Sequence, residues 1–134
     1  MSTPFDTVRG YVTDIGLEIT REDAAEQLLV VAAPDRGIDH LVLDCEGDIL
    51  ILEQLICELP SAPAETYAQL LKLNRNLIHG AFCLDEETGK RLIFRDTLAL
   101  ENLDCNEVES SVNALSLMLA ENSEQLISFA RQGK

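Results

Sequence analysis

The stretch that decides the fold is IDHLVLDCEGDILILEQLIC, residues 38–57. Two aliphatic runs flank Glu46–Asp48, and a glycine inside so short a joint is typical of a tight hairpin. Apolar residues stand at consecutive positions in Leu41–Leu43 and in Ile49–Leu52, whereas a strand with one wet face alternates apolar and polar residues. We therefore predict an antiparallel sheet whose two faces both meet apolar groups, with a partner as one candidate for the cover of one face.

The residues before this stretch predict a short helix and further strands. Ser2 or Thr3 can cap the helix, which has Pro4 at its first position, Asp6 in a capping-box arrangement with Thr3, and Gly16 as its end. A turn with the sequence PDRG separates the second and third strands. The predicted strands of the meander are Leu17–Thr20, Leu28–Ala33, Ile38–Cys45 and Ile49–Cys57.

A broad apolar helix is predicted over Ala64–Ile78, with Gly80 as its stop. Its apolar side chains spread around more than one stripe, which exceeds what a surface helix needs for one core contact. We interpret the excess as a dimer or partner surface, because a two-fold axis lets such a patch cover its copy; core burial is the competing explanation. The residues of this predicted surface are Tyr67, Leu70, Leu71, Leu73, Leu77 and Ile78.

A hairpin and a long helix complete the chain. Ala81–Leu84 and Arg91–Phe94 are the predicted hairpin strands, and Thr97–Leu100 continues as a strand or strand edge. All 134 residues are thus predicted to form one α+β domain, which consists of an N-terminal helix, an antiparallel β-meander, a middle helix, a β-hairpin and a long C-terminal helix.

The charge balance restricts the kinds of partner. The chain has 10 basic and 24 acidic side chains, so its formal net charge is −14. This excess argues against nucleic acid as a partner, because displacing counterions from phosphates needs lysine and arginine, and it disfavours anionic lipid for the same reason. No stretch approaches the ~20 apolar residues that cross a bilayer, and the first residues lack a secretory pattern. We expect a cytoplasmic protein that does not insert into membranes and binds basic or neutral proteins.

No pattern in the sequence predicts an enzyme, a cofactor or a metal site. The paired carboxylates fall in predicted turns or at a helix start, where they are expected to be solvated. His40 and His79 are isolated from nucleophiles, and the dispersed glycines form no phosphate-binding loop. The four cysteines include no C-x-x-C pair, so we expect reduced thiols, most of them in the core.

Cys105 carries the one hypothesis of thiol chemistry. It lies at or beside the start of the last helix, which Asp104 or Asn106 can cap, and the positive end of a helix dipole can stabilise a thiolate. Asp104 and Glu107 act in the opposite direction, because negative charge nearby raises a thiol pKa. A thiol redox sensor, or a small enzyme using Cys105, therefore stays open as an alternative.

One block of the chain resembles a known family. It comprises Leu70–Asn74, Gly80–Phe82 opening a strand that runs through Leu84 and Asp85, a turn ending at Gly89, and Thr97–Leu100 with Leu103 before the last helix. In order and spacing these segments resemble class I type III secretion chaperones, the CesT-like family, and the related YbjN-like bacterial proteins. The resemblance implies a small, acidic, cytoplasmic homodimer without enzymatic activity.

The resemblance leaves two kinds of protein binding open. The secretion chaperones hold a client's segment extended against their surface, and this is our leading hypothesis: exposed strand edges would supply main-chain hydrogen bonds and apolar grooves would take side chains. The YbjN-like branch includes regulators and proteins associated with stress, which implies instead a stress-linked regulatory adaptor with a folded partner.

Overall fold

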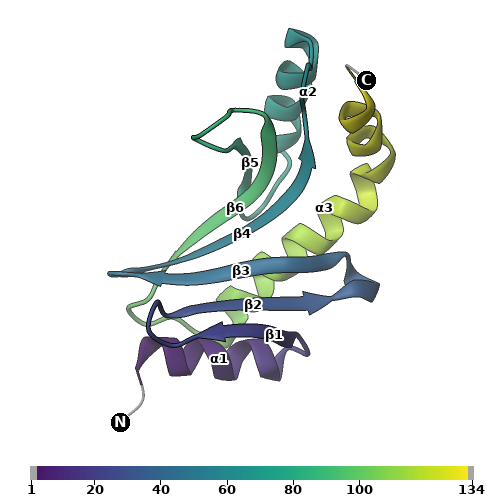
Figure 1. Cartoon of the computed structure of the whole chain (residues 1–134). Coiled ribbons are helices and arrows are strands. Elements are labelled where there is room, and N and C mark those ends of the chain that lie inside the picture. The colour runs from purple at the N-terminus through teal and green to yellow at the C-terminus, as the bar shows by residue number, and fades with distance from the viewer. Residues whose placement is uncertain (1–2, 133–134) are drawn as a thin grey trace.

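The protein folds into two layers, in which helices cover one face of an antiparallel sheet (Figure 1). The computed structural model describes residues 3–132. The sheet has six strands in the order β1-β2-β3-β4-β6-β5, so β1 and β5 are its edges. In chain order the elements are α1 (Pro4–Asp14), β1 (Glu18–Asp23), β2 (Leu28–Ala33), the 3₁₀ turn η1 (Pro34–Arg36), β3 (Ile38–Glu46), β4 (Ile49–Glu58), α2 (Ala64–Asn74), β5 (Ala81–Leu84), β6 (Arg91–Ala99) and α3 (Cys105–Arg131). The predicted α+β class and element order are confirmed.

The predicted capping box at the start of α1 is confirmed. The Thr3 side chain accepts a hydrogen bond from the Asp6 backbone N–H at 3.1 Å, and Asp6 Oδ2 accepts one from the Thr3 N–H at 3.0 Å. These bonds satisfy donors that the first turn of a helix leaves unpaired. The alternative cap, Ser2, lies outside the described residues. At α3 it is Asp104 that caps, since its side chain accepts the Glu107 N–H at 2.8 Å.

Two regions of predicted strand differ from the structure by more than one residue. β1 lies further along the chain than Leu17–Thr20, because its pairing with the whole of β2 carries the strand into polar residues. Arg91–Phe94 and Thr97–Leu100 belong together in β6, which ends one residue before Leu100, since the long β4 pairs with it without a break across Arg95. In both cases the partner strand sets the length, and the local apolar pattern does not.

α2 is shorter than predicted, because it ends at Asn74 and not at Ile78. The Asn74 side chain turns toward β5, where its Oδ1 accepts the Phe82 N–H at 2.6 Å and its Nδ2 donates to the Phe82 carbonyl at 3.2 Å. Gly80, the predicted stop, lies beyond the helix. Its φ is +74°, and a Cβ there would stand 2.5 Å from the Phe94 ring, so both conformation and space favour glycine.

The hydrophobic core lies between the sheet and the helices. The strand register aligns Leu29, Leu43 and Leu52 in one row across β2, β3 and β4, and each is at most 1% exposed. From the helical layer, Val112 and Leu115 of α3 join the same buried cluster. Burying an aliphatic side chain contributes about 1.5–3 kcal/mol, so this face fixes where the helices lie and commits the alternate residues of each strand to the other face.

Candidate functional site

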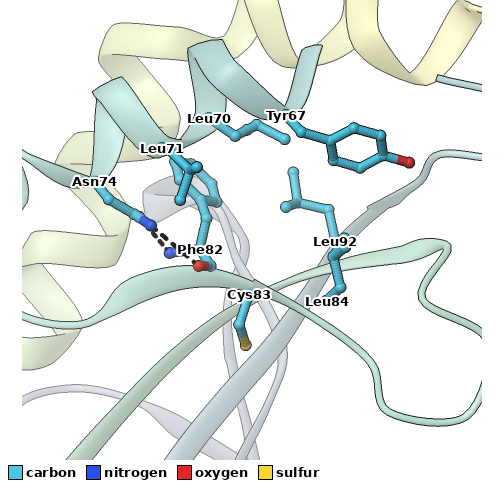
Figure 2. A pocket seen from close by; sticks show the side chains of 8 residues that line it. All are labelled: Tyr67, Leu70, Leu71, Asn74, Phe82, Cys83, Leu84 and Leu92. Atoms are coloured by element: carbon cyan, nitrogen blue, oxygen red, sulfur yellow. Dashed lines mark hydrogen bonds between the residues drawn. The ribbon is translucent and has the colours of Figure 1, made fainter. Parts of the chain in front are cut away.

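An apolar hollow lies between α2 and β5 at one edge of the sheet (Figure 2). Its volume is about 370 Å³. Figure 2 shows the side chains of Tyr67, Leu70 and Leu92 converging between the helix and the strands, whereas that of Cys83 points away. We call this feature the α2–β5 hollow, and its lining residues are Tyr67, Leu70, Leu71, Asn74, Phe82, Cys83, Leu84 and Leu92.

The strand that borders the hollow is open along one side. Within the described residues 3–132 β5 pairs with β6 alone, so alternate residues of β5 turn their backbone N–H and C=O groups away from the sheet. Phe82 is one of these residues, and the Asn74 side chain occupies both of its groups. By the strand period of two, the next outward-facing backbone groups are those of Leu84, whose side chain is 40% exposed. The hollow therefore adjoins a strand edge that can accept another extended chain.

The predicted surface of the middle helix divides into two parts, of which three residues line the α2–β5 hollow. Leu70 is 4% exposed and belongs to the core, so its interpretation as an outward residue is wrong. Tyr67 is half-buried in the hollow wall, and Leu71 is 71% exposed at the rim. Leu71 is thus the clearest apolar contact that this side of α2 offers to a partner.

The other three predicted residues face α3. Leu73, Leu77 and Ile78 line a smaller hollow of about 110 Å³ together with Leu117 and Met118 of α3. Leu73 and Leu77 are half-buried against the core, whereas Ile78, in the turn after α2, is 85% exposed. The prediction combined two surfaces because it placed all six residues on one continuous helix. In the structure α2 lies between β5 and α3, so one group of residues faces β5 and the other faces α3.

The second face of the sheet carries apolar side chains that no described helix covers, and we call it the open face. Its residues alternate along the strands with those of the core and are absent from the buried core cluster. Leu55 is 53% exposed there. The consecutive apolar residues predicted that both faces meet apolar groups, and the open face is the one left for a partner. Its apolar residues include Leu28, Val42, Ile49, Ile51, Leu55 and Ile93.

Sequence reasoning missed the polar residue that organises the α2–β5 hollow. Asn74 belongs to the block that resembles the chaperone family, yet no role was predicted for its side chain. A helix over Ala64–Ile78 would place it within the last turns and away from any strand. Asparagine near a helix end, followed by a glycine that requires positive φ, is the signal that could have indicated a side chain bonded to the next strand.

The four cysteines lack the environment of a reactive thiol. Burial raises the pKa of the half-buried Cys45, Cys57 and Cys83 thiols. Cys105 is the first residue of α3, as predicted, but burial raises the pKa of its thiol as well, and the nearby carboxylates, Asp14 foremost, raise it further. A higher pKa leaves less thiolate at neutral pH, so the electrostatics argue against a redox role for Cys105.

Residues 3–132 contain neither a cluster of metal-binding side chains nor a helix that could span a membrane. That part of the chain contains no group of three or more histidine, cysteine, aspartate or glutamate side chains arranged to hold a metal ion. Nor does any helix in it have the length and hydropathy that a membrane span requires. The features described above are the α2–β5 hollow, the strand edge beside it and the open face.

Comparisons with known proteins agree on the fold. The family model CesT_Tir_1 matches residues 1–132. The structure of YbjN from E. coli superposes with a TM-score of 0.68 at 19% identity, covering 90% of this chain and 92% of that one. A chain in the complex of the Yersinia pestis type III secretion chaperone SycH with a fragment of YscM2 gives 0.56 at 14% identity, covering 95% and 99%. The ExsC–ExsE complex gives 0.60 at 17% identity, covering 97% and 95%. A search of curated proteins finds no match to the sequence.

Proposed function

The chain belongs to the CesT_Tir_1 family, and we propose that it is a non-enzymatic, homodimeric cytoplasmic protein that holds a segment of another protein. The observation that carries the proposal is the α2–β5 hollow, in which exposed Leu71 and Leu84 flank an apolar cavity beside an open strand edge. Among the structures of similar fold, SycH was determined with a fragment of YscM2, and ExsC with ExsE. The fold therefore occurs in complexes with other proteins.

In the proposed complex, backbone groups would supply hydrogen bonds to the segment and the apolar hollow would take its side chains. An extended segment beside β5 would gain main-chain hydrogen bonds from the outward groups of Leu84, while its alternate side chains enter the hollow. Because the chain carries a net charge of −14, basic segments would be attracted over a Debye length of ~10 Å at 0.1 M salt. Salt should therefore slow association more than it speeds release.

Dimerisation would involve the same side of α2. Leu71 stands almost free of its own chain, and an isologous contact would let the Leu71 side chains of the two copies cover one another, which leaves the hollow itself to the segment. Sedimentation velocity at micromolar concentration should give a species near twice the chain mass of 14.8 kDa. Leu71→Asp should shift it to the monomer, whereas Lys72→Asp, at the exposed next position, should leave the dimer intact. A wild-type protein that sediments only as a monomer would remove the dimer from the proposal.

Segment binding is tested with a library of random peptides displayed on phage and selected on the immobilised protein. We expect enriched peptides that combine apolar and basic residues, and association rates that fall as salt rises. Circular dichroism of each variant separates lost binding from lost folding. If repeated selections enrich no sequence above those recovered on a neutral control protein, segment binding is wrong. A native mass spectrum with a stoichiometric small-molecule cofactor would overturn the non-enzymatic part.

The second candidate is a regulatory adaptor that binds a folded partner. The observation that favours it is the likeness to YbjN, described as a candidate transcription regulator, which superposes with a higher TM-score than the SycH–YscM2 and ExsC–ExsE complexes. A competition experiment with peptides of the partner's sequence distinguishes the segment-binding protein from the regulatory adaptor. A partner held through one segment is displaced by the peptide copied from that segment, whereas a folded partner is not displaced by any linear peptide of its sequence.

A further inference from the structure

The open face contains a charged side chain whose direct neighbours on both adjacent strands are apolar. In the strand register Asp44 of β3 lies between Leu28 of β2 and Ile51 of β4, and the next row of the same face contains Val42. Asp44 is half-buried, whereas aspartate side chains are mostly exposed and are rarely buried without a partner. Within residues 3–132 no basic group forms an ion pair with it.

The charged groups around Asp44 are mostly of its own sign. Glu46 stands two positions along β3 on the same face, Glu26 lies in the turn before β2, and Glu53 belongs to the neighbouring row on β4. From the outer strands the face receives Asp23 and Arg21 of β1 and Arg95 of β6, and Arg95 is bonded to Glu53. Together these surroundings raise the pKa of Asp44 to about 6: burial contributes most, then the Glu46 carboxyl beside it, then Glu26 and Glu53.

We propose that the open face is the docking surface for an amphipathic helix of the partner protein, and that a lysine or arginine of this helix lies over Asp44. The proposal rests on the proposed function and deepens it, since it names a second surface and the chemistry of what binds there. Asp44 is then the residue that selects a basic side chain, while Leu28, Val42 and Ile51 contact the apolar stripe of the helix.

The backbone of the sheet explains why the occupant is a helix. Along β2, β3 and β4 the backbone groups are committed to ladders with both neighbouring strands, so a chain that lies across the face finds no main-chain partner. A buried extended segment would leave its own N–H and C=O groups unpaired, whereas a helix satisfies them internally. A helix is ~10 Å wide and strands are ~4.8 Å apart, so one helix covers about two strands. A helix centred over β3 therefore reaches Leu28 of β2 on one side of Asp44 and Ile51 of β4 on the other.

Charge complementarity explains why the occupant is basic. An apolar helix alone would bury Asp44 further and leave a charge without a partner, which is costly. A lysine or arginine over Asp44 favours its ionised form, so docking should release a proton near pH 6. Affinity should therefore fall as pH falls through 6, because the protonated carboxyl no longer attracts the cation.

The test uses a designed peptide of leucine, alanine and lysine, about 18 residues or ~27 Å long as an amphipathic helix. Its control has glutamate in place of lysine. Binding is followed at pH 7 by amide chemical shifts of the ¹⁵N-labelled protein. We expect the lysine peptide to shift the amides of Leu28, Val42 and Ile51 and the glutamate peptide to shift none of them. Asp44→Asn should weaken binding of the lysine peptide about fivefold, the upper range for a partly exposed pair.

A matched variant separates Asp44 from the general acidity of the chain. Glu124→Gln removes one exposed charge from α3 and should leave the affinity unchanged within error. At pH 5 the wild type should bind about as weakly as Asp44→Asn, because a carboxyl with a pKa of about 6 is then mostly protonated. Shifts spread over the acidic surface, equal effects of the two variants, or absence of binding at millimolar peptide would each overturn the proposal. Peptides that bind only at the α2–β5 hollow would do the same, yet would leave the proposed function standing.

Discussion

Asp44→Asn should make the protein more stable at neutral pH, although it removes a native side chain. The pKa of Asp44 is raised from 3.8 to about 6 by burial first and by Glu46 next, so the fold disfavours its ionised form. Raising the pKa from 3.8 to about 6 corresponds to a loss of at most ~3 kcal/mol in the free energy of unfolding at neutral pH. Asp44 is only half-buried and solvent screens its neighbours, so we discount this to about 1 kcal/mol. Asparagine has nearly the same shape and no charge, and should recover that amount.

The sign of the pH dependence follows from the proton count of the two states. Between pH 4 and 6 folded Asp44 holds a proton that the unfolded chain has lost, so its contribution to stability falls as pH rises through this window. Below pH 4 both states are protonated and the charge has no effect. The gain from Asp44→Asn should therefore be near zero at pH 4 and complete above about pH 7.

Urea denaturation followed by circular dichroism measures the difference. Wild type, Asp44→Asn and the control Glu124→Gln are compared at pH 7.5 and at pH 4, provided that the slope of the transition stays the same. The control removes an equal charge from an exposed position on α3, so it corrects for the general repulsion in a chain of net charge −14. If Asp44→Asn raised the free energy of unfolding equally at both pH values, or if both variants raised it equally, the ionised Asp44 carboxylate would not be the cause of the lost stability.

Three further outcomes test the α2–β5 region and the thiols. Gly80→Ala should lower stability by about 2 kcal/mol or more, read as a lower melting temperature, because the new Cβ meets the buried Phe94 ring at positive φ. Asn74→Ala should cost about 1–3 kcal/mol and speed amide exchange at Phe82, since two hydrogen bonds to β5 are lost; unchanged exchange would contradict the bonding. Cys105 should react with iodoacetamide at neutral pH no faster than a simple peptide thiol, and a much faster rate would restore the redox hypothesis.

Sequence patterns correctly predicted the features that depend on residues close together in the chain. The capping box joins Thr3 and Asp6, three residues apart, and the sequence alone was sufficient to place it. The strands over Leu28–Ala33 and Ala81–Leu84 were also placed correctly, because an apolar run bounded by turn residues defines each of them. The limits of β1 and β6 were missed, since these strands extend through charged residues that are ordered by backbone pairing with a partner strand and not by an apolar pattern of their own. For β1 that partner is β2, the next strand along the chain, and for β6 it is the more distant β4.

For the candidate sites, too, the sequence identified residues on one element but not the contacts between elements. The six apolar residues of the middle helix were recognised, but their separation into two surfaces depends on where β5 and α3 lie, which no helical period contains. Asp44 was not singled out, although it stands within the stretch that decides the fold. Its neighbours Leu28 and Ile51 come from other strands through the register, and the sequence reasoning expected the paired carboxylates in turns to be solvated.

Asp44 connects the stability of the fold to its proposed use. A carboxylate among Leu28, Val42 and Ile51 weakens the free protein at neutral pH, and an amide or aliphatic side chain would fill the same place without that penalty. Functional surfaces are where such locally unfavourable choices are expected, because a group that is unsatisfied in the free state gains most when a partner arrives. The two measurements on Asp44→Asn are therefore decisive together. If the variant is more stable and binds the lysine peptide less well, the Asp44 carboxylate lowers the stability of the free protein and contributes to binding. If the variant is more stable and binds equally well, the charge has no role in binding on the open face.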